Sequence, residues 1–181
     1  MAITQKAVET PTEFAKPSSG AEKNSHKDIQ VVEFVLGNEH FAIDLFDVKE
    51  VVEYTTITKI PNTASYVKGI IDLRGEITMI IDLKQRLNIH DGPATTVNTS
   101  RIIVLDDKIT SSKIGIMVDD VSSVSTFEMS NVDKTTASIS NEDTSIIGII
   151  KKKVRVKDKD INELIIWVDI KKLLEGIETR M

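Results

Sequence analysis

The 181-residue chain contains no cysteine. It can therefore form no disulfide, has no thiol nucleophile and cannot bind a metal through thiolates. The three histidines, His26, His40 and His90, share no motif with one another or with a carboxylate at ligand spacing. A glycine-rich phosphate loop and a nucleophile elbow are also missing. We therefore expect no enzymatic activity, no catalytic residue, no metal site and no cofactor.

Aromatic residues make up only 4% of the chain, whereas hydrophobic residues make up 40%. The core must therefore be aliphatic, and its many Ile and Val residues favour strands over helices. No apolar run approaches the roughly 18 residues of a membrane-spanning helix, and the first residues lack the apolar core of a secretory signal. A net charge of −5 argues against a nucleic-acid partner.

Residues 66–83 predict a β-hairpin, because two apolar runs flank the turn Arg74-Gly75-Glu76. Gly75 can adopt a positive φ without steric cost, as a tight hairpin turn requires. The hairpin places Arg74 at its tip, beside an apolar surface. There Arg74 is either a solvated turn residue or a contact for an acidic partner.

The rest of the chain reads as short strands with little helix. Strands are expected at residues 31–36, 41–43, 102–105, 114–118, 121–129, 146–150 and 164–168, one helical turn at 84–87, and a closing helix at 171–177. Residues 45–52 mix periods and fit either a helical turn or a twisted strand. Residues 1–27 have no apolar period and predict a disordered tail. Residues 90–100 predict a linker and 131–143 a loop. The basic cluster at 151–159 is expected to be a strand pair or loop with a solvated face; nucleic-acid binding is disfavoured because no aromatic residues interleave.

The two halves of the chain echo each other weakly. Gly69-Ile70-Ile71 is matched by Gly148-Ile149-Ile150, and Ile81-Asp82 by Val168-Asp169. Such a duplication predicts two similar small β units, and the short strands favour barrels. Asp44, Asp82, Asp119 and Asp169 each follow an apolar strand. Four carboxylates could form a metal or acid–base site, but we favour caps of the turns at strand ends.

The central hairpin also resembles the signature of the CheW family of chemotaxis coupling proteins. Residues 69–75 read GIIDLRG and residues 80–83 read IIDL, which resemble the family's Leu-Arg-Gly turn and its apolar-Asp-Leu close. The similarity extends from about residue 30 to residue 174. One departure is Met79, where many family members carry a proline, and it bears on strand geometry more than on function.

The resemblance implies a mainly β fold with two SH3-like, five-stranded β-barrel subdomains packed face to face and a short C-terminal helix. It places a CheW-like domain at residues 28–177, after a tail at 1–27. The two intertwined subdomains would lie at about 28–90 and 100–170.

The family likeness also implies a non-catalytic adaptor that couples methyl-accepting chemoreceptors to the histidine kinase CheA. Its partners would be the regulatory domain of CheA and the cytoplasmic tips of the receptors, in membrane-associated arrays and without membrane insertion. The alternative is a CheW-like scaffold for a two-component system outside chemotaxis, in surface motility or gene regulation. A small β-barrel enzyme or nucleic-acid binder is opposed by the missing motifs and the acidic charge.

For the receptor-binding groove, the resemblance implies five residues: Val48, Glu50, Val51, Lys68 and Arg74. The simpler alternative is that Glu50 and Arg74 pair with each other at the surface, where such a pair contributes only ~0–1 kcal/mol to stability.

Overall fold

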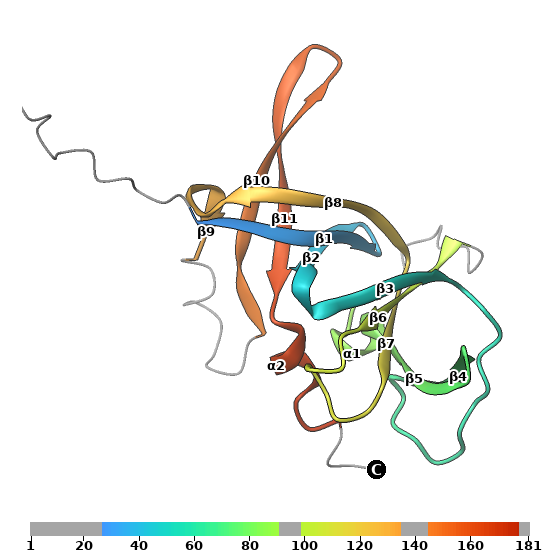
Figure 1. Cartoon of the computed structure of the whole chain (residues 1–181). Helices are drawn as coiled ribbons and strands as arrows, with labels where there is room; N and C mark the ends of the chain where they lie inside the picture. The colour runs from blue at the N-terminus through green and yellow to red at the C-terminus, as the bar shows by residue number, and fades with distance from the viewer. Residues whose placement is uncertain (1–26, 91–98, 135–144, 178–181) are drawn as a thin grey trace, which may run out of the picture.

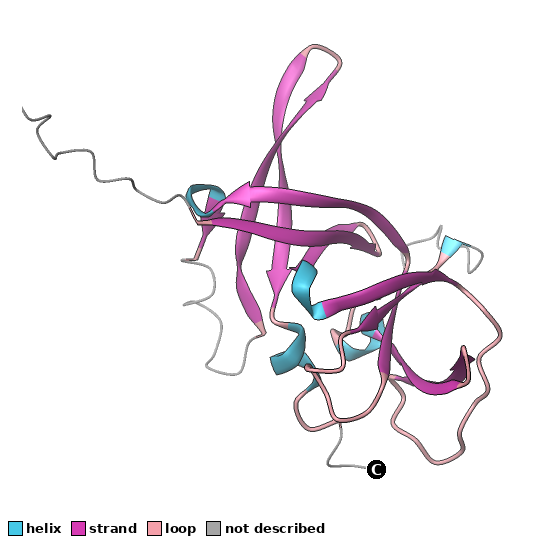
Figure 2. Ribbon diagram, in the orientation of Figure 1, coloured by secondary structure: helices cyan, strands magenta, loops and turns pink. Residues whose placement is uncertain are grey.

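The structure, a computed structural model, describes residues 27–90, 99–134 and 145–177. Nearly all its regular elements are strands (Figure 2), as the aliphatic composition predicts. All but the last residue of the expected tail lies outside the described residues, as does most of the linker expected at 90–100.

The strands form two sheets (Figure 1). Sheet A has the order β8-β1-β2-β11-β10-β9, with bounds β1 (Asp28–Leu36), β2 (Glu39–Asp44), β8 (Asp120–Glu128), β9 (Val132–Asp133), β10 (Ile146–Val156) and β11 (Lys159–Val168). Sheet B has the order β3-β6-β7-β5-β4, with bounds β3 (Val48–Glu53), β4 (Val67–Leu73), β5 (Glu76–Asp82), β6 (Arg101–Leu105) and β7 (Ile114–Val118). The short helical elements are η1 (Leu45–Asp47), α1 (Leu83–Arg86), η3 (Met129–Asn131) and α2 (Ile170–Leu174). The expected mainly β fold with two β units and a short C-terminal helix is confirmed, although sheet A has six strands and not the expected five.

The two sheets share one topology. In sheet A, β1 and β2 are antiparallel, and β2 pairs in parallel with β11 of the β10–β11 hairpin. In sheet B, β6 and β7 are likewise antiparallel, and β7 pairs in parallel with β5 of the β4–β5 hairpin. Register shifts occur next to Gly69 in β4 and Gly148 in β10. These equivalent positions explain the sequence echo between the halves.

Each half of the chain also contributes to both sheets. After β2 the chain crosses from sheet A to supply β3, the edge strand of sheet B; after β7 it crosses from sheet B to supply β8, which pairs with β1 in sheet A. We call this arrangement the reciprocal crossing. Each sheet therefore draws strands from both segments for which subdomains were expected, 28–90 and 100–170.

The main apolar core lies between the sheets. It contains Phe34 of β1 and Phe41 of β2, whose rings stack at 6.0 Å, together with Ile81 of β5, Ile103 of β6 and Ile116 of β7. Each sheet also has a smaller apolar cluster on its other face. The central strands are therefore buried on both faces, which explains why β6 is a continuous apolar run and not an alternating one.

The hairpin expected at residues 66–83 is confirmed as β4 and β5. Its two-residue turn has φ of 55° at Arg74 and 84° at Gly75, and both residues therefore take the positive φ of a type I′ turn. Gly69 permits another close approach. A Cβ there would lie 2.1 Å from the carbonyl oxygen of Thr58, so a side chain at this position would break the bridge between Thr58 and Ile70.

Some boundaries differ from the sequence prediction. The loop expected at 131–143 contains the two-residue strand β9, which pairs with Ile149 and Ile150 of β10; residues 135–143 of it lie outside the described residues. The basic cluster forms the strand pair, not the loop, because β10 continues to Val156. The closing helix ends at Leu174 and not at residue 177.

Candidate functional site

Arg74 and Glu50 form a bidentate ion pair on sheet B. The guanidinium donates from Nη1 to Oε1 at 3.1 Å and from Nη2 to Oε2 at 2.8 Å. The Arg74 side chain is 75% exposed, whereas that of Glu50 is 22% exposed. The carboxylate therefore fixes the orientation of an arginine that stays accessible to a partner.

This ion pair connects the two edges of sheet B. Glu50 lies on β3 and Arg74 follows β4, and these are the first and last strands of the sheet. Nearby, Thr58 in the segment between β3 and β4 bridges to Ile70 of β4 with two hydrogen bonds of 2.9 Å. The side chains of the two edge strands of sheet B therefore meet at Arg74, although the backbones of β3 and β4 do not pair.

The pair belongs to a group of charged side chains that we call the charged rim: Lys49, Glu50, Arg74, Glu76, Asp107 and Lys113. Lys113 contacts Glu76 at 2.7 Å and Asp107 at 3.3 Å, and Lys49 contacts Asp107 at 3.5 Å. The hydrogen bond from Lys113 and the charges of Lys113 and Lys49 lower the pKa of Asp107. The hollow inside the rim is only about 60 Å³, so the rim suits a protein surface better than a small molecule.

The other three predicted groove residues, Val48, Val51 and Lys68, take no part in the ion pair between Glu50 and Arg74. Val48 packs partly buried against the main core, and Val51 is exposed on β3. Lys68 on β4 contacts Asp82 and lines a different pocket from Arg74. The structure thus brings Glu50 and Arg74 together, while a groove shared by all five residues stays a prediction.

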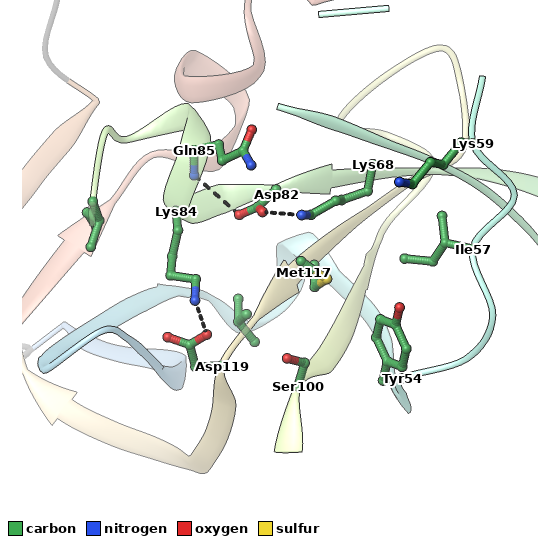
Figure 3. Close-up of a pocket in the computed structure, with 12 residues that line it drawn as sticks. Tyr54, Ile57, Lys59, Lys68, Asp82, Lys84, Gln85, Ser100, Met117 and Asp119 are labelled. Atoms are coloured by element: carbon green, nitrogen blue, oxygen red, sulfur yellow. Dashed lines mark hydrogen bonds and ion pairs between the residues drawn. The ribbon is translucent and has the colours of Figure 1, made fainter. Parts of the chain in front are cut away.

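The pocket beside Lys68 contains two lysine–aspartate pairs, and we call it the lysine–aspartate pocket (Figure 3). Lys68 contacts Asp82 at 3.1 Å and Lys84 contacts Asp119 at 2.6 Å. Both aspartates are buried. The pocket has a volume of about 300 Å³, but its two carboxylates are already occupied by lysines. Among residues 27–90, 99–134 and 145–177, no group of acidic and histidine side chains is arranged to hold a metal ion.

The repeated strand-end aspartates are caps at three of four positions. The side chain of Asp44 accepts a hydrogen bond from the backbone N–H of Phe46 at 2.9 Å, that of Asp82 from Gln85 at 3.2 Å and that of Asp169 from Lys172 at 3.0 Å. The capping prediction is therefore confirmed for these three aspartates. Asp119 is different, because its Oδ2 accepts from the N–H of Gly37 at 2.6 Å, 82 residues away. This contact joins the β1–β2 turn of sheet A to the end of β7 in sheet B. Sequence reasoning missed it, since a local capping rule cannot find a distant donor.

Asp47 in η1 has an unfavourable electrostatic environment. Burial, followed by the charge of Asp44, raises the pKa of Asp47, and Lys108 only partly opposes this. An aspartate whose folded-state pKa is raised costs stability when ionised, and this cost disappears as the pH falls through the raised pKa.

We therefore expect Asp47→Asn to raise the free energy of unfolding at pH 7 by less than about 1 kcal/mol. The gain should vanish in acid, where Asp47 of the unchanged protein takes up its proton. Chemical denaturation at several pH values measures both effects, with the exposed Asp28→Asn as the control. A loss of stability at neutral pH would show that the Asp47 carboxylate is favourable after all.

No helix within the described part of the chain is long and apolar enough to cross a membrane.

Comparisons with known proteins agree on one family. The family model of the CheW-like domain matches residues 30–178. The chain is similar to the chemotaxis protein CheW of Bacillus subtilis (strain 168), with 28% identity over 128 residues, 70% of this chain and 80% of that protein. It is also similar to the chemotaxis protein CheW of Klebsiella aerogenes, with 41% identity over 91 residues, which span about half of each: 50% of this chain and 52% of that protein.

A solved structure gives the same result. The crystal structure of the scaffolding protein TtCheW from Thermoanaerobacter tengcongensis superposes with a TM-score of 0.63 and 34% identity, covering 81% of this chain and 88% of that chain.

Proposed function

Because the chain belongs to the CheW-like family, we propose that it is a non-catalytic chemotaxis adaptor that couples methyl-accepting chemoreceptors to the histidine kinase CheA. The family match over residues 30–178 is the observation that carries this proposal. The names of similar proteins, a chemotaxis protein and a scaffolding protein, support it. The adaptor would work at receptor arrays on the cytoplasmic side of the membrane.

The charged rim and the exposed Arg74 support a role in protein contact. A rigid, exposed arginine is a frequent source of binding energy at protein interfaces. Glu50 holds it in a fixed orientation, so little conformational freedom is lost when a partner binds. We propose that the receptor tip contacts this surface, together with the exposed Val51.

A reconstitution experiment tests the proposal. Purified chain is mixed with CheA and with a chemoreceptor signalling fragment assembled on vesicles, all from one organism, and the vesicles are sedimented. We expect the chain to sediment only with receptor, and CheA to require the chain for full recovery and activity. The chain alone is expected neither to hydrolyse ATP nor to accept a phosphoryl group.

Two results would redirect the proposal. Binding to a CheA-type kinase without binding to any chemoreceptor would favour the scaffold of a two-component system outside chemotaxis. ATP hydrolysis or phosphorylation of the purified chain would overturn the non-catalytic assignment.

A further inference from the structure

The β10–β11 hairpin extends beyond the rest of sheet A (Figure 1). Its strands pair from Ile146 and Val168 to Val156 and Lys159. On one side β9 pairs only with Ile149 and Ile150, and on the other side β2 pairs with β11 only at residues 165–167. Within the described residues, the outer half of the hairpin therefore has no third strand on either edge.

The outer half also exposes apolar side chains. Val156 and Ile161 are each 48% exposed and Leu164 is 56% exposed. Val154 lies opposite Ile161 in the ladder, so these two share a face. A two-stranded hairpin is only marginally stable on its own, and open edges next to exposed apolar residues are where other strands add.

Charge is divided unequally between the two strands. β10 carries the basic side chains Lys151, Lys152, Lys153 and Arg155, whereas the outer part of β11 is mixed, with Lys159, Asp160 and Glu163. Lys152 contacts Glu33 at 2.7 Å and Lys151 contacts Asp133 at 3.3 Å. Lys153 and Arg155 form no ion pair with any other described residue. The outer edge of β10 is thus cationic in a chain of net charge −5.

The strand β9 shows what kind of segment this edge accepts. β9 is a two-residue extended strand on the inner part of the same edge, and its Asp133 contacts Lys151. The residues before Val132 turn into η3, which lies beside Lys151, so a strand added beyond η3 would pass Lys153 and Arg155.

We propose that the outer edge of β10, from Lys153 to Val156, binds an extended acidic segment of another protein as an added strand. Backbone hydrogen bonds would supply affinity, and carboxylates at alternate positions would meet Lys153 and Arg155. A negatively charged membrane is a poorer occupant, because the tip of the hairpin has no net charge: Asp158 and Asp160 offset Lys157 and Lys159. The site is on sheet A, apart from the charged rim on sheet B, and is independent of the receptor contact proposed above.

The probe for this proposal is a labelled peptide of about ten residues, the length of a long strand, in which Glu alternates with Thr and Val. Binding to the full chain is measured by fluorescence anisotropy and by NMR amide shifts. We expect binding with shifts concentrated along β10. The same peptide with Lys in place of Glu, or with two internal prolines that remove backbone donors, is expected not to bind.

Variants of the chain separate this edge from general charge attraction. Lys153→Glu with Arg155→Glu should weaken binding by about tenfold, because like charges would face each other across the strands. Lys153→Gln with Arg155→Gln should weaken it less and keeps the hairpin free of new repulsion with Asp160. The matched control, Lys59→Glu with Lys171→Glu, makes the same change in net charge at two exposed lysines away from this hairpin and should alter binding by less than about twofold.

Several outcomes would overturn the proposal. The proposal is wrong if the acidic peptide does not bind, or if the two charge-reversed variants weaken peptide binding equally. It is also wrong if the peptide with two prolines binds as well as the original peptide. Binding to phosphatidylserine vesicles through Lys153 and Arg155, without peptide binding, would identify a membrane surface instead.

Discussion

Replacing Asp119 with alanine is expected to lower the free energy of unfolding by about 3 kcal/mol, because it removes a buried ion pair and a buried hydrogen bond together. The Asp119 carboxylate lies 2.6 Å from Lys84 Nζ and 2.6 Å from the backbone nitrogen of Gly37. For a chain of this length, that loss corresponds to a fall in Tm of roughly 6–12 °C. Chemical denaturation and thermal unfolding measure it.

Two further variants help to explain the effect of Asp119→Ala on stability. Asp119→Asn keeps an oxygen that can accept from Gly37 but removes the charge, so it should fall between the alanine variant and the unchanged protein. Asp120→Ala is the matched control, because Asp120 is the exposed neighbour and accepts from the N–H of Val121 at 2.9 Å. It should change stability by less than about 0.5 kcal/mol. If Asp119→Ala behaves like this control, the connection between the sheets is energetically unimportant.

The second large effect is expected on binding and not on stability. Arg74→Ala should weaken receptor binding by roughly thirtyfold, equivalent to about 2 kcal/mol. The free energy of unfolding should fall by no more than about 1 kcal/mol, since the Arg74 side chain is 75% exposed. Glu50→Ala should also weaken binding, because the arginine then loses its fixed orientation. Denaturation and receptor co-sedimentation of the same preparations compare the two quantities.

The controls for Arg74 test what the arginine does. Arg155→Ala removes an arginine from sheet A and should leave receptor binding unchanged. The double variant Glu50→Ala with Arg74→Ala should be little worse than Arg74→Ala alone if the two residues act as one unit. Unchanged binding with a stability loss of several kcal/mol would make Arg74 a structural residue that joins the edges of sheet B. If neither quantity changes, Arg74 is only a solvated turn residue.

Local sequence patterns predicted the individual strands well. The hairpin at residues 66–83 followed from two apolar runs and a turn glycine, all close in sequence. The echo of Gly69 by Gly148 indicated a duplication, and both glycines lie beside equivalent register shifts. The sheet that each strand joins was not predictable, because apolar periodicity records which face is buried and not which strand lies alongside. β9 was missed because backbone pairing to β10 makes it extended, without any apolar alternation of its own.

The same limit applies to the candidate site. The pairing of Glu50 with Arg74 could be considered from sequence, because the family resemblance singled out both residues. The link between Asp119 and Gly37 could not, since nothing local distinguishes Asp119 from the three aspartates that cap turns. Lys68 was grouped with Arg74 through family resemblance, yet its side chain contacts Asp82 in the lysine–aspartate pocket.

The reciprocal crossing makes the chain resemble a domain-swapped dimer built from one polypeptide. Each repeat places one hairpin in one sheet and its other strands in the opposite sheet, so a single repeat would be left with unpaired strand edges. Two copies of it would complete each other by exchanging these strands, as β3 to β5 join β6 and β7 in this chain and β8 to β11 join β1 and β2. Joining the end of the first copy to the start of the second fixes this partnership within one chain. Neither sheet can then separate without breaking the other, and the two are expected to unfold in a single transition.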